Sequence, residues 1–491
     1  MAPQIDLPPE ISRSDKTPRT AVAFDRTSGV KQTSDLQKFV LLVGQKLAAG
    51  SIASGVPVDL FRETDSENFF GPGSVLDAMA KAAFKAYPLV RMRAVAVDDP
   101  VGAKATNTVT FVGTATGADG AELFVAGRRV AAQVSTGDTA TVIAAALRDA
   151  VNAIVDLPVV ATAAAGVVTL TAQNKGVAPN DISVRADMLL GTSGVTVAVG
   201  TAKMTGGAGA IDVTAALAAV AAVRHHDIAL GVNDGTNAGV LSGFLDLQGD
   251  AEHSHGQVGI IAVATPASLA STTTLATTLD GVRMLVYWLE GSESWFPTVA
   301  AAAAAVMSSE EDPAKPYNTL PLPGILPPPI ASRPIRGEIT SALANGVSPL
   351  VVVPGDQVAI LRAVSTHTLD GGGHPDYSVF DIMTIQSFDY MRDNIEQMFS
   401  ERYARSKWAD DDPDGLLPPD VATPAKVKDD IIDVCRTLER LGILQQVEEL
   451  KDEIVVNKVG TNCQFSIPAD FVQSLQEALG KIVLIQAPFA A

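Results

Sequence analysis

KFVLLVG, at residues 38–44, is a short run of apolar residues that ends at a glycine. A run of this length between polar segments predicts a strand that is buried on both faces. Residues 73–86 follow with apolar side chains at helical spacing, and residues 91–97 again have the composition of a strand. A strand, a helix and a strand in this order are typical of a parallel sheet covered by helices, so we expect an α/β core.

The same pattern resumes after residue 210. Further elements are expected as strands at residues 227–232, 258–264, 282–289 and 357–364, and as helices at residues 213–223 and 241–249. Residues 36–99 and 210–370 together therefore predict one α/β core domain.

Between these two parts the composition changes. Residues 100–209 are rich in threonine, valine, alanine and glycine and contain almost no aromatic residues. Half-buried strands are expected at residues 108–112, 122–125, 129–134, 167–172 and 182–185, and one helix at residues 139–154 with Asp138 as its cap. We interpret this segment as a compact β-rich domain that is inserted into the core and displayed outward.

A proline-rich segment, NTLPLPGILPPP, occupies residues 318–329 and is named the strap below. Its prolines remove backbone donors and favour extended geometry, which excludes a helix or a central strand. A disordered linker would be polar, whereas the strap carries apolar residues that we expect to be buried, namely Leu320, Leu322, Ile325 and Leu326. The strap is therefore predicted to cross between two parts of the fold.

Two further helices are predicted near the C-terminus. The first covers residues 378–407. The second begins at Thr423 and Pro424, a cap and a first-turn proline, and stops at Gly442. With a later strand, these helices predict an α+β domain at residues 371–480.

The two ends of the chain are expected to form extended arms. Residues 1–35 are polar, with one β-like run at Thr20, Ala21, Val22, Ala23 and Phe24. Residues 481–491 contain a terminal strand that includes Ile482, Val483, Leu484 and Ile485. Neither β segment has an obvious local partner, so both favour strand exchange between the subunits of a polymer.

Composition argues against several classes of protein. The chain has 491 residues, of which 47% are apolar and 19% charged, so it can bury a sizeable core. Its net charge of −19 argues against a nucleic-acid partner. The N-terminus lacks the apolar run of a signal peptide, and the alanine-rich residues 299–307 are too few to span a bilayer. We expect a soluble protein without membrane insertion.

Three groups of histidine and aspartate are candidates for catalysis or metal binding: His225, His226 and Asp227; His253 and His255; His374 and Asp376. None has the additional ligands of a zinc site, and no serine lies in a GxSxG turn. The glycine-rich segments match neither phosphate-binding pattern. We therefore expect no catalytic residue, no metal and no cofactor.

Two cysteines and three basic residues are candidates for contacts between proteins. Cys435 falls on the apolar face of its helix and Cys463 in a polar segment, and the two are either free thiols or form an inter-subunit disulfide. Arg402, Arg405 and Lys407 lie at the end of the first C-terminal helix. They are either a solvated helix end or a contact for an acidic partner.

Several segments, taken in order, resemble the contractile phage tail sheath proteins, in particular the Mu-like branch. They are FVLLVGQKLAAGS at 39–51, GPGSVLDAMAKAAF at 71–84, TGADGAELFVAGRRV at 116–130, VVTLTAQNKG at 167–176, the strap, ERYARSKWADD at 401–411 and IPADFVQSLQ at 467–476. The likeness spans nearly the whole chain.

The resemblance implies a core of subtilisin-like topology and discs of six subunits stacked helically around a tail tube. Baseplate and tail terminator proteins would bind the ends of this sheath, which would contract to drive the tube through the host envelope and would be assembled in the host cytoplasm as part of the virion. The terminal arms would add strands to neighbouring subunits. The C-terminal domain would contact the tube, which places Arg402, Arg405 and Lys407 near it.

Two other functions stay open at this point. The sheath of a headless contractile injection particle has the same implied subunit. An α/β hydrolase with a β-rich accessory domain would need a catalytic triad around His374 or His253 and would be a monomer.

Overall fold

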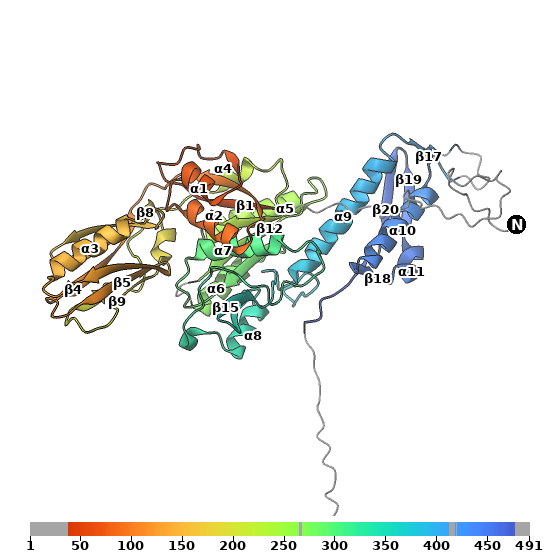
Figure 1. Ribbon diagram of the computed structural model, residues 1–491. Coiled ribbons are helices and arrows are strands. Elements are labelled where there is room, and N and C mark those ends of the chain that lie inside the picture. The colour runs from red at the N-terminus through yellow and green to blue at the C-terminus, as the bar shows by residue number, and fades with distance from the viewer. Residues whose placement is uncertain (1–37, 265–267, 412–417, 419, 477–491) are drawn as a thin grey trace, which may run out of the picture. The chain divides into compact units, whose positions relative to one another are not determined.

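A central sheet of eight strands organises this computed structural model, which describes residues 38–264, 268–411, 418 and 420–476 (Figure 1). The strand order is β15 (Gln357–Ile360), β14 (Ser348–Val353), β13 (Met284–Trp288), β12 (Val258–Val263), β11 (Asp227–Leu230), β1 (Phe39–Gln45), β3 (Arg91–Val97) and β2 (Pro57–Leu60). The inner strands are parallel, and only β2 and β15 at the edges are antiparallel to their neighbours. The expected α/β core is confirmed.

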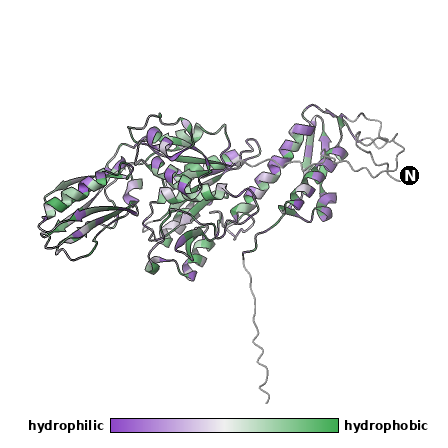
Figure 2. Ribbon diagram, viewed as in Figure 1, coloured by the Kyte–Doolittle hydropathy of each residue, from purple (hydrophilic) through white to green (hydrophobic). Residues whose placement is uncertain are grey.

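Helices cover this sheet because its inner strands are apolar on both faces. The side chains of Val40 to Val43 in β1 are fully buried, and the strands of the sheet are coloured mostly hydrophobic in Figure 2. Helices α2 (Val75–Ala86) and α7 (Phe296–Ser308) pack against each other and on the sheet, with the small side chains of α7 buried in the contact. The other core helices are α1 (Glu63–Phe70), α4 (Thr214–Ala218), α5 (Gly235–Gly249), α6 (Leu269–Leu279) and α8 (Arg336–Ala344).

Two smaller sheets and a helix follow β3. One sheet has the order β10 (Thr196–Val199), β4 (Lys104–Val112), β8 (Val167–Lys175) and β7 (Val159–Ala164), and the other β6 (Arg128–Val134), β5 (Asp119–Val125) and β9 (Val184–Met188). Helix α3 (Ala140–Asn152) lies along strands of both sheets (Figure 1). The five expected strands are present, while β7 and β10 were not predicted.

Asp138 does not cap α3 as expected. The N-cap residue is Thr139, which makes no side-chain capping bond. The carboxylate of Asp138 instead accepts a hydrogen bond from the Ser135 amide at 2.7 Å. Asp138 lies one residue before the N-cap, so its carboxylate closes the preceding turn at Ser135 and does not cap the amides of the first helical turn.

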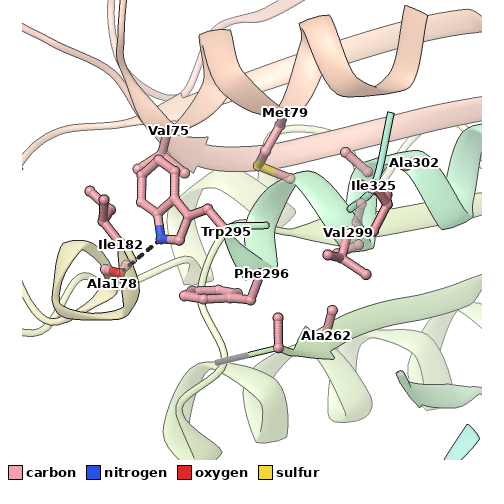
Figure 3. Close-up of a cluster of buried hydrophobic side chains, with 14 of the residues drawn as sticks. Val75, Met79, Ala178, Ile182, Ala262, Trp295, Phe296, Val299, Ala302 and Ile325 are labelled. Carbon is pink, nitrogen blue, oxygen red and sulfur yellow. Dashed lines mark hydrogen bonds between the residues drawn. The ribbon is translucent and has the colours of Figure 1, made fainter. Parts of the chain in front are cut away.

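Trp295 joins these smaller sheets to the core (Figure 3). Its buried ring lies beside Val75 of α2 and Ile182, and its Nε1 donates a hydrogen bond to the Ala178 carbonyl oxygen at 3.1 Å. On the same side, the Asn174 side-chain oxygen accepts from the amide of Val75, the first residue of α2. Residues 174–182 are therefore part of the packing around α2 and α7.

The strap covers the outer edge of β15. Its Leu322 amide donates to the Val358 carbonyl at 2.7 Å, and the Ile360 amide donates to the Leu320 carbonyl at 2.9 Å. As expected it forms neither a helix nor a central strand, and Leu322 and Ile325 are buried. Leu320 is only partly buried and Leu326 is exposed, because one side of an edge segment faces solvent.

The strap begins and ends within the core, although its first residue, Asn318, also donates a hydrogen bond to Gln476 near the C-terminus at 2.7 Å. The strap leads from α7 into α8, and both of these helices pack on the eight-stranded sheet. Prolines suit this position because an edge segment needs donors on one side only.

The C-terminal residues form two helices and several short strands. Helix α9 (Ile382–Arg402) is shorter at both ends than expected, and α10 (Pro424–Arg440) begins and ends as expected. The Thr423 hydroxyl accepts from the Lys426 amide, and Gly442 has a φ of 74°. The remaining elements are β16 (Lys407–Trp408), β17 (Val421–Ala422), β18 (Leu444–Gln445), α11 (Val447–Leu450), β19 (Val455–Val459), β20 (Asn462–Ser466) and β21 (Asp470–Phe471).

No helix within the described ranges is long and apolar enough to cross a membrane.

Substitution of Trp295 tests the joint around its side chain. Trp295→Ala is expected to lower the free energy of unfolding by about 3–5 kcal/mol, because it leaves a cavity among buried residues and an unpaired Ala178 carbonyl. Trp295→Phe keeps most of the packing and loses the donor, at a cost of about 1–2 kcal/mol. Denaturant unfolding measures both, with exposed Val142→Ala as the control. Equal stability of Trp295→Ala and the parent protein would contradict the assignment.

Candidate functional site

An ion pair fixes the first half of α9 to the eight-stranded sheet. Arg283 directly precedes β13 and donates to both carboxylate oxygens of Asp389 on α9, at 2.6 and 2.8 Å. Both side chains are almost completely buried, with 6% and 5% of their surface exposed. Gly256 leaves room for this carboxylate, because a Cβ at that position would lie 2.0 Å from an oxygen of Asp389.

Two more arginines extend this network. Arg224, which precedes β11, pairs with Asp393 on α9 and donates from Nε to the Gly256 carbonyl at 2.9 Å. Arg392 on α9 donates to the Gly249 carbonyl at the end of α5, at 3.0 Å. Burial raises the pKa of Asp393, against the opposing effect of Arg224. The charged contacts thus gather where β11 and β13 begin, and α9 covers that edge of the sheet.

The second half of α9 packs against the other C-terminal elements. Phe399 stacks on Phe465 of β20 with ring centroids 5.4 Å apart. Asp430 on α10 accepts hydrogen bonds from both Arg402 and the Tyr403 hydroxyl. One continuous helix therefore contacts the core at one end and α10 and β20 at the other.

The three basic residues singled out in the sequence lie along one open groove or beside it. Arg402 is paired with Asp430, and Lys407 lies 3.3 Å from Asp420. Arg405 is exposed. The groove has a volume of about 680 Å³ and is lined by Arg402, Arg405 and residues of α10, among others. Two of the three cations thus have acidic partners within the chain, and Arg405 is the one best placed to meet another protein.

The hairpin of β19 and β20 has open edges. Within the described ranges, each of its strands pairs only with the other. Val455, Val459 and Phe465 expose about half of their side chains. An isolated two-stranded hairpin is marginally stable in water, and its unpaired backbone groups can accept further strands. β19 was missed in the sequence, although three of its five residues are valines, which are common in strands.

The segments proposed for strand exchange, residues 20–24 and 482–485, lie outside the described residues.

The two cysteines differ in accessibility. Cys435 lies on the buried side of α10 with 3% of its surface exposed, and burial raises the pKa of its thiol to about 11. Cys463 in β20 is partly exposed, and burial raises its pKa as well. Both are free thiols in the single chain. Cys463 is therefore the residue through which an inter-subunit disulfide would form.

The candidate histidines form no common site, although the buried His225 lies close enough to His255 for their charges to interact. His226 accepts a hydrogen bond from the Phe39 amide, His253 pairs with Asp250 and His255 lies 3.2 Å from Gln248. His374 is exposed beside Asp370. In the part of the chain that the structure describes, no hydroxyl bonds to His253 or His374, and no cluster of three or more ligands could hold a metal ion. A hydrolase triad built on His253 or His374 is therefore absent from the described residues.

Asp227 is a buried carboxyl group at the start of β11. It is completely inaccessible to solvent, and no hydrogen bond to either carboxylate oxygen is present among the described residues. Burial raises its pKa to about 6, although the nearby Lys38 ammonium opposes the shift. Burial lowers the pKa of Lys38 itself. Such a group destabilises the fold when it is ionised.

The chain matches two protein families along its length. Residues 206–366 match the family described as the phage tail sheath protein central domain, and residues 375–485 match the phage tail sheath C-terminal domain. These two stretches contain the strap, α9, α10 and the hairpin.

Two relatives extend over almost the entire chain. The tail sheath protein of the Mu-like prophage FluMu of Haemophilus influenzae is 29% identical over 464 residues, which cover 92% of this chain and 93% of that protein. The crystal structure of the sheath tail protein of Desulfitobacterium hafniense superposes with a TM-score of 0.51 at 14% identity, covering 93% of this chain and 97% of the other. This second likeness concerns the fold.

The raised pKa of Asp227 predicts how stability depends on pH. The folded chain holds this proton more tightly than the unfolded chain, so stability should fall as pH rises from about 4 to about 6 and stay lower above that. Asp227→Asn should remove this dependence and stabilise the protein at pH 7 by about 1–3 kcal/mol, with no gain below pH 4. Thermal unfolding of both proteins between pH 4 and 8 measures the effect, and identical pH profiles would refute it.

Proposed function

Because the chain belongs to the phage tail sheath family and is a structural subunit of a contractile sheath, we propose that its copies form six-membered discs around a tail tube and drive that tube through the host envelope. The main support is that the central and C-terminal sheath domains follow each other along the chain, at residues 206–366 and 375–485. The sheath would be bound by a baseplate and a tail terminator and assembled in the host cytoplasm. Its energy would be stored in the assembled lattice, without nucleotide hydrolysis.

Strand exchange would hold the subunits together. Residues 20–24 and 482–485 supply the strands, and the hairpin of β19 and β20 offers two edges that have no partner strand within the described ranges and can accept them. Main-chain hydrogen bonds of this kind keep copies connected while each subunit turns as a body. Cys463 lies on one of these edges, where an inter-subunit disulfide would add a covalent connection.

The chain would divide into parts with separate tasks. Residues 36–99 and 210–370 form a core of subtilisin-like topology, residues 100–209 an outward domain, and residues 371–480 the domain that meets the tube. The continuous helix α9 supports this division, because it contacts the core with one end and α10 with the other. The same subunit would serve in a headless contractile particle, but the Mu-like prophage relative favours a phage tail.

Removal of the arms tests strand exchange. Deletion of residues 1–25, or of residues 481–491, should abolish polymerisation while leaving a folded monomer, because the donated strands are lost and the described fold is untouched. Electron microscopy and sedimentation report polymer, and circular dichroism reports folding. Intact polymers after both deletions would disprove the mechanism.

Charge reversal tests the contact with the tube. Arg405→Glu should reduce assembly on co-expressed tube protein several-fold, because Arg405 is exposed at the groove and forms no ion pair with another described residue. Arg402→Glu and Lys407→Glu should act in the same direction but also break pairs within the chain. Arg148→Glu on α3 is the matched control. Normal assembly of Arg405→Glu on the tube would exclude this contact.

A further inference from the structure

The net charge of the chain is confined to one part of its sequence. Residues 1–209 contain 19 lysines and arginines and 19 aspartates and glutamates. Residues 210–476 contain 16 of the former and 35 of the latter, which accounts for the whole net charge of −19. Copies that approach one another with their acidic parts repel, so a contact between copies is favoured where it includes the balanced part of the chain.

The balanced part contains an exposed apolar patch at one edge of the eight-stranded sheet. Phe61, directly after β2, and Leu89, shortly before β3, expose 79% and 78% of their surface. Pairing of Leu60 with Met92 places both residues at the same end of the β2–β3 pair. The outer side of β2 has no partner strand in the described ranges. We name Phe61 and Leu89 the β2 patch.

The opposite edge of the same sheet carries a second apolar patch. Ile330 and Ile335, just after the strap, expose 81% and 67% of their surface. Arg333 lies between them in sequence and donates to Asp356, in the turn between β14 and β15, at 2.9 Å. This ion pair holds the segment beside the β15 edge. We name Ile330 and Ile335 the strap patch.

The two patches differ in a way that determines how copies can meet. The β2 edge has no partner strand among the described residues and lies in the charge-balanced part, whereas the β15 edge is covered by the strap in the acidic part. Two β2 edges that paired with each other would form a closed two-fold dimer, which cannot extend into a sheath. Two strap patches that paired with each other would also form a closed two-fold dimer. Contact of one kind of edge with the other avoids this closure.

We propose that the β2 patch of one copy packs on the strap patch of the next, so that the core sheets of neighbouring subunits lie edge to edge. The partner is a second copy of this chain, and the inference rests on the proposed function of a sheath subunit. Contact between different surfaces repeats from copy to copy, as a ring or helix requires. Phe61 is its central side chain, because a large exposed aromatic ring loses the most water-accessible area on contact.

Disulfide trapping tests which surfaces meet. Phe61→Cys and Ile335→Cys are combined in one chain that also carries Cys463→Ser, while the buried Cys435 is kept. After polymerisation and mild oxidation, denaturing gels without reductant should show ladders of several cross-linked copies. Either cysteine alone should give no ladder. A polymer that forms without ladders would overturn the pairing of these two patches.

Charged substitutions give a second measurement. Phe61→Asp or Ile335→Asp should raise the critical concentration for polymerisation at least about tenfold and leave the circular dichroism of the monomer unchanged, because both side chains are exposed in the single chain. Val142→Asp, an exposed apolar residue of α3, should have no such effect. Unaltered polymerisation of Phe61→Asp would refute the contact. Failure of the unsubstituted chain to polymerise with tube protein would refute the proposed function itself.

Discussion

Parallel strands must be covered on both faces, and this constraint determines how the described chain is arranged. The inner strands of the eight-stranded sheet are apolar on both sides, so α2 and α7 have to stay in place for the sheet to exclude water. Trp295 and Asn174 hold those two helices from the side of the smaller sheets. The β-rich residues 104–199 therefore stabilise the core and are more than an appendage to it.

The amino ends of the parallel strands are closed in a different way. There the structure places charged side chains, and α9 lies over them with the Arg283–Asp389 pair at its centre. A buried pair of this kind contributes little net stability, but removal of one partner leaves an uncompensated charge and is costly. Its value is in specifying one position of α9 on the sheet. Gly256 adds to that specificity, because no larger residue leaves space for the Asp389 carboxylate.

Local patterns in the sequence were sufficient for β1, α2, β3 and the ends of α10. Each depends on residues within one or two turns or on a single strand. The helix expected at residues 213–223 is only Thr214–Ala218, and Phe388, an apolar residue of α9, is half exposed. Helical spacing shows which residues share a face of α9, but not how far along that face the core extends.

The ion pairs of α9 could not have been found in this way. Arg283 and Asp389 are 106 positions apart, and neither belongs to a recognisable motif. Pairing between distant residues also affects the basic residues that were predicted to contact another protein. Arg402 and Lys407 looked like a free basic cluster, yet their acidic partners Asp430 and Asp420 come from later parts of the chain. Arg405 remains an exposed basic residue, as its position in the sequence indicated.

The one-sided charge of the chain also has a consequence for the protein before it assembles. Free copies at high concentration repel one another through residues 210–476, which keeps them dispersed and slows random aggregation. The same repulsion opposes every addition to a growing polymer, so growth requires contacts that are extensive and correctly oriented. The excess of carboxylates in residues 210–476 therefore has two effects. It keeps the monomer dispersed, and it restricts polymer growth to extensive, correctly oriented contacts.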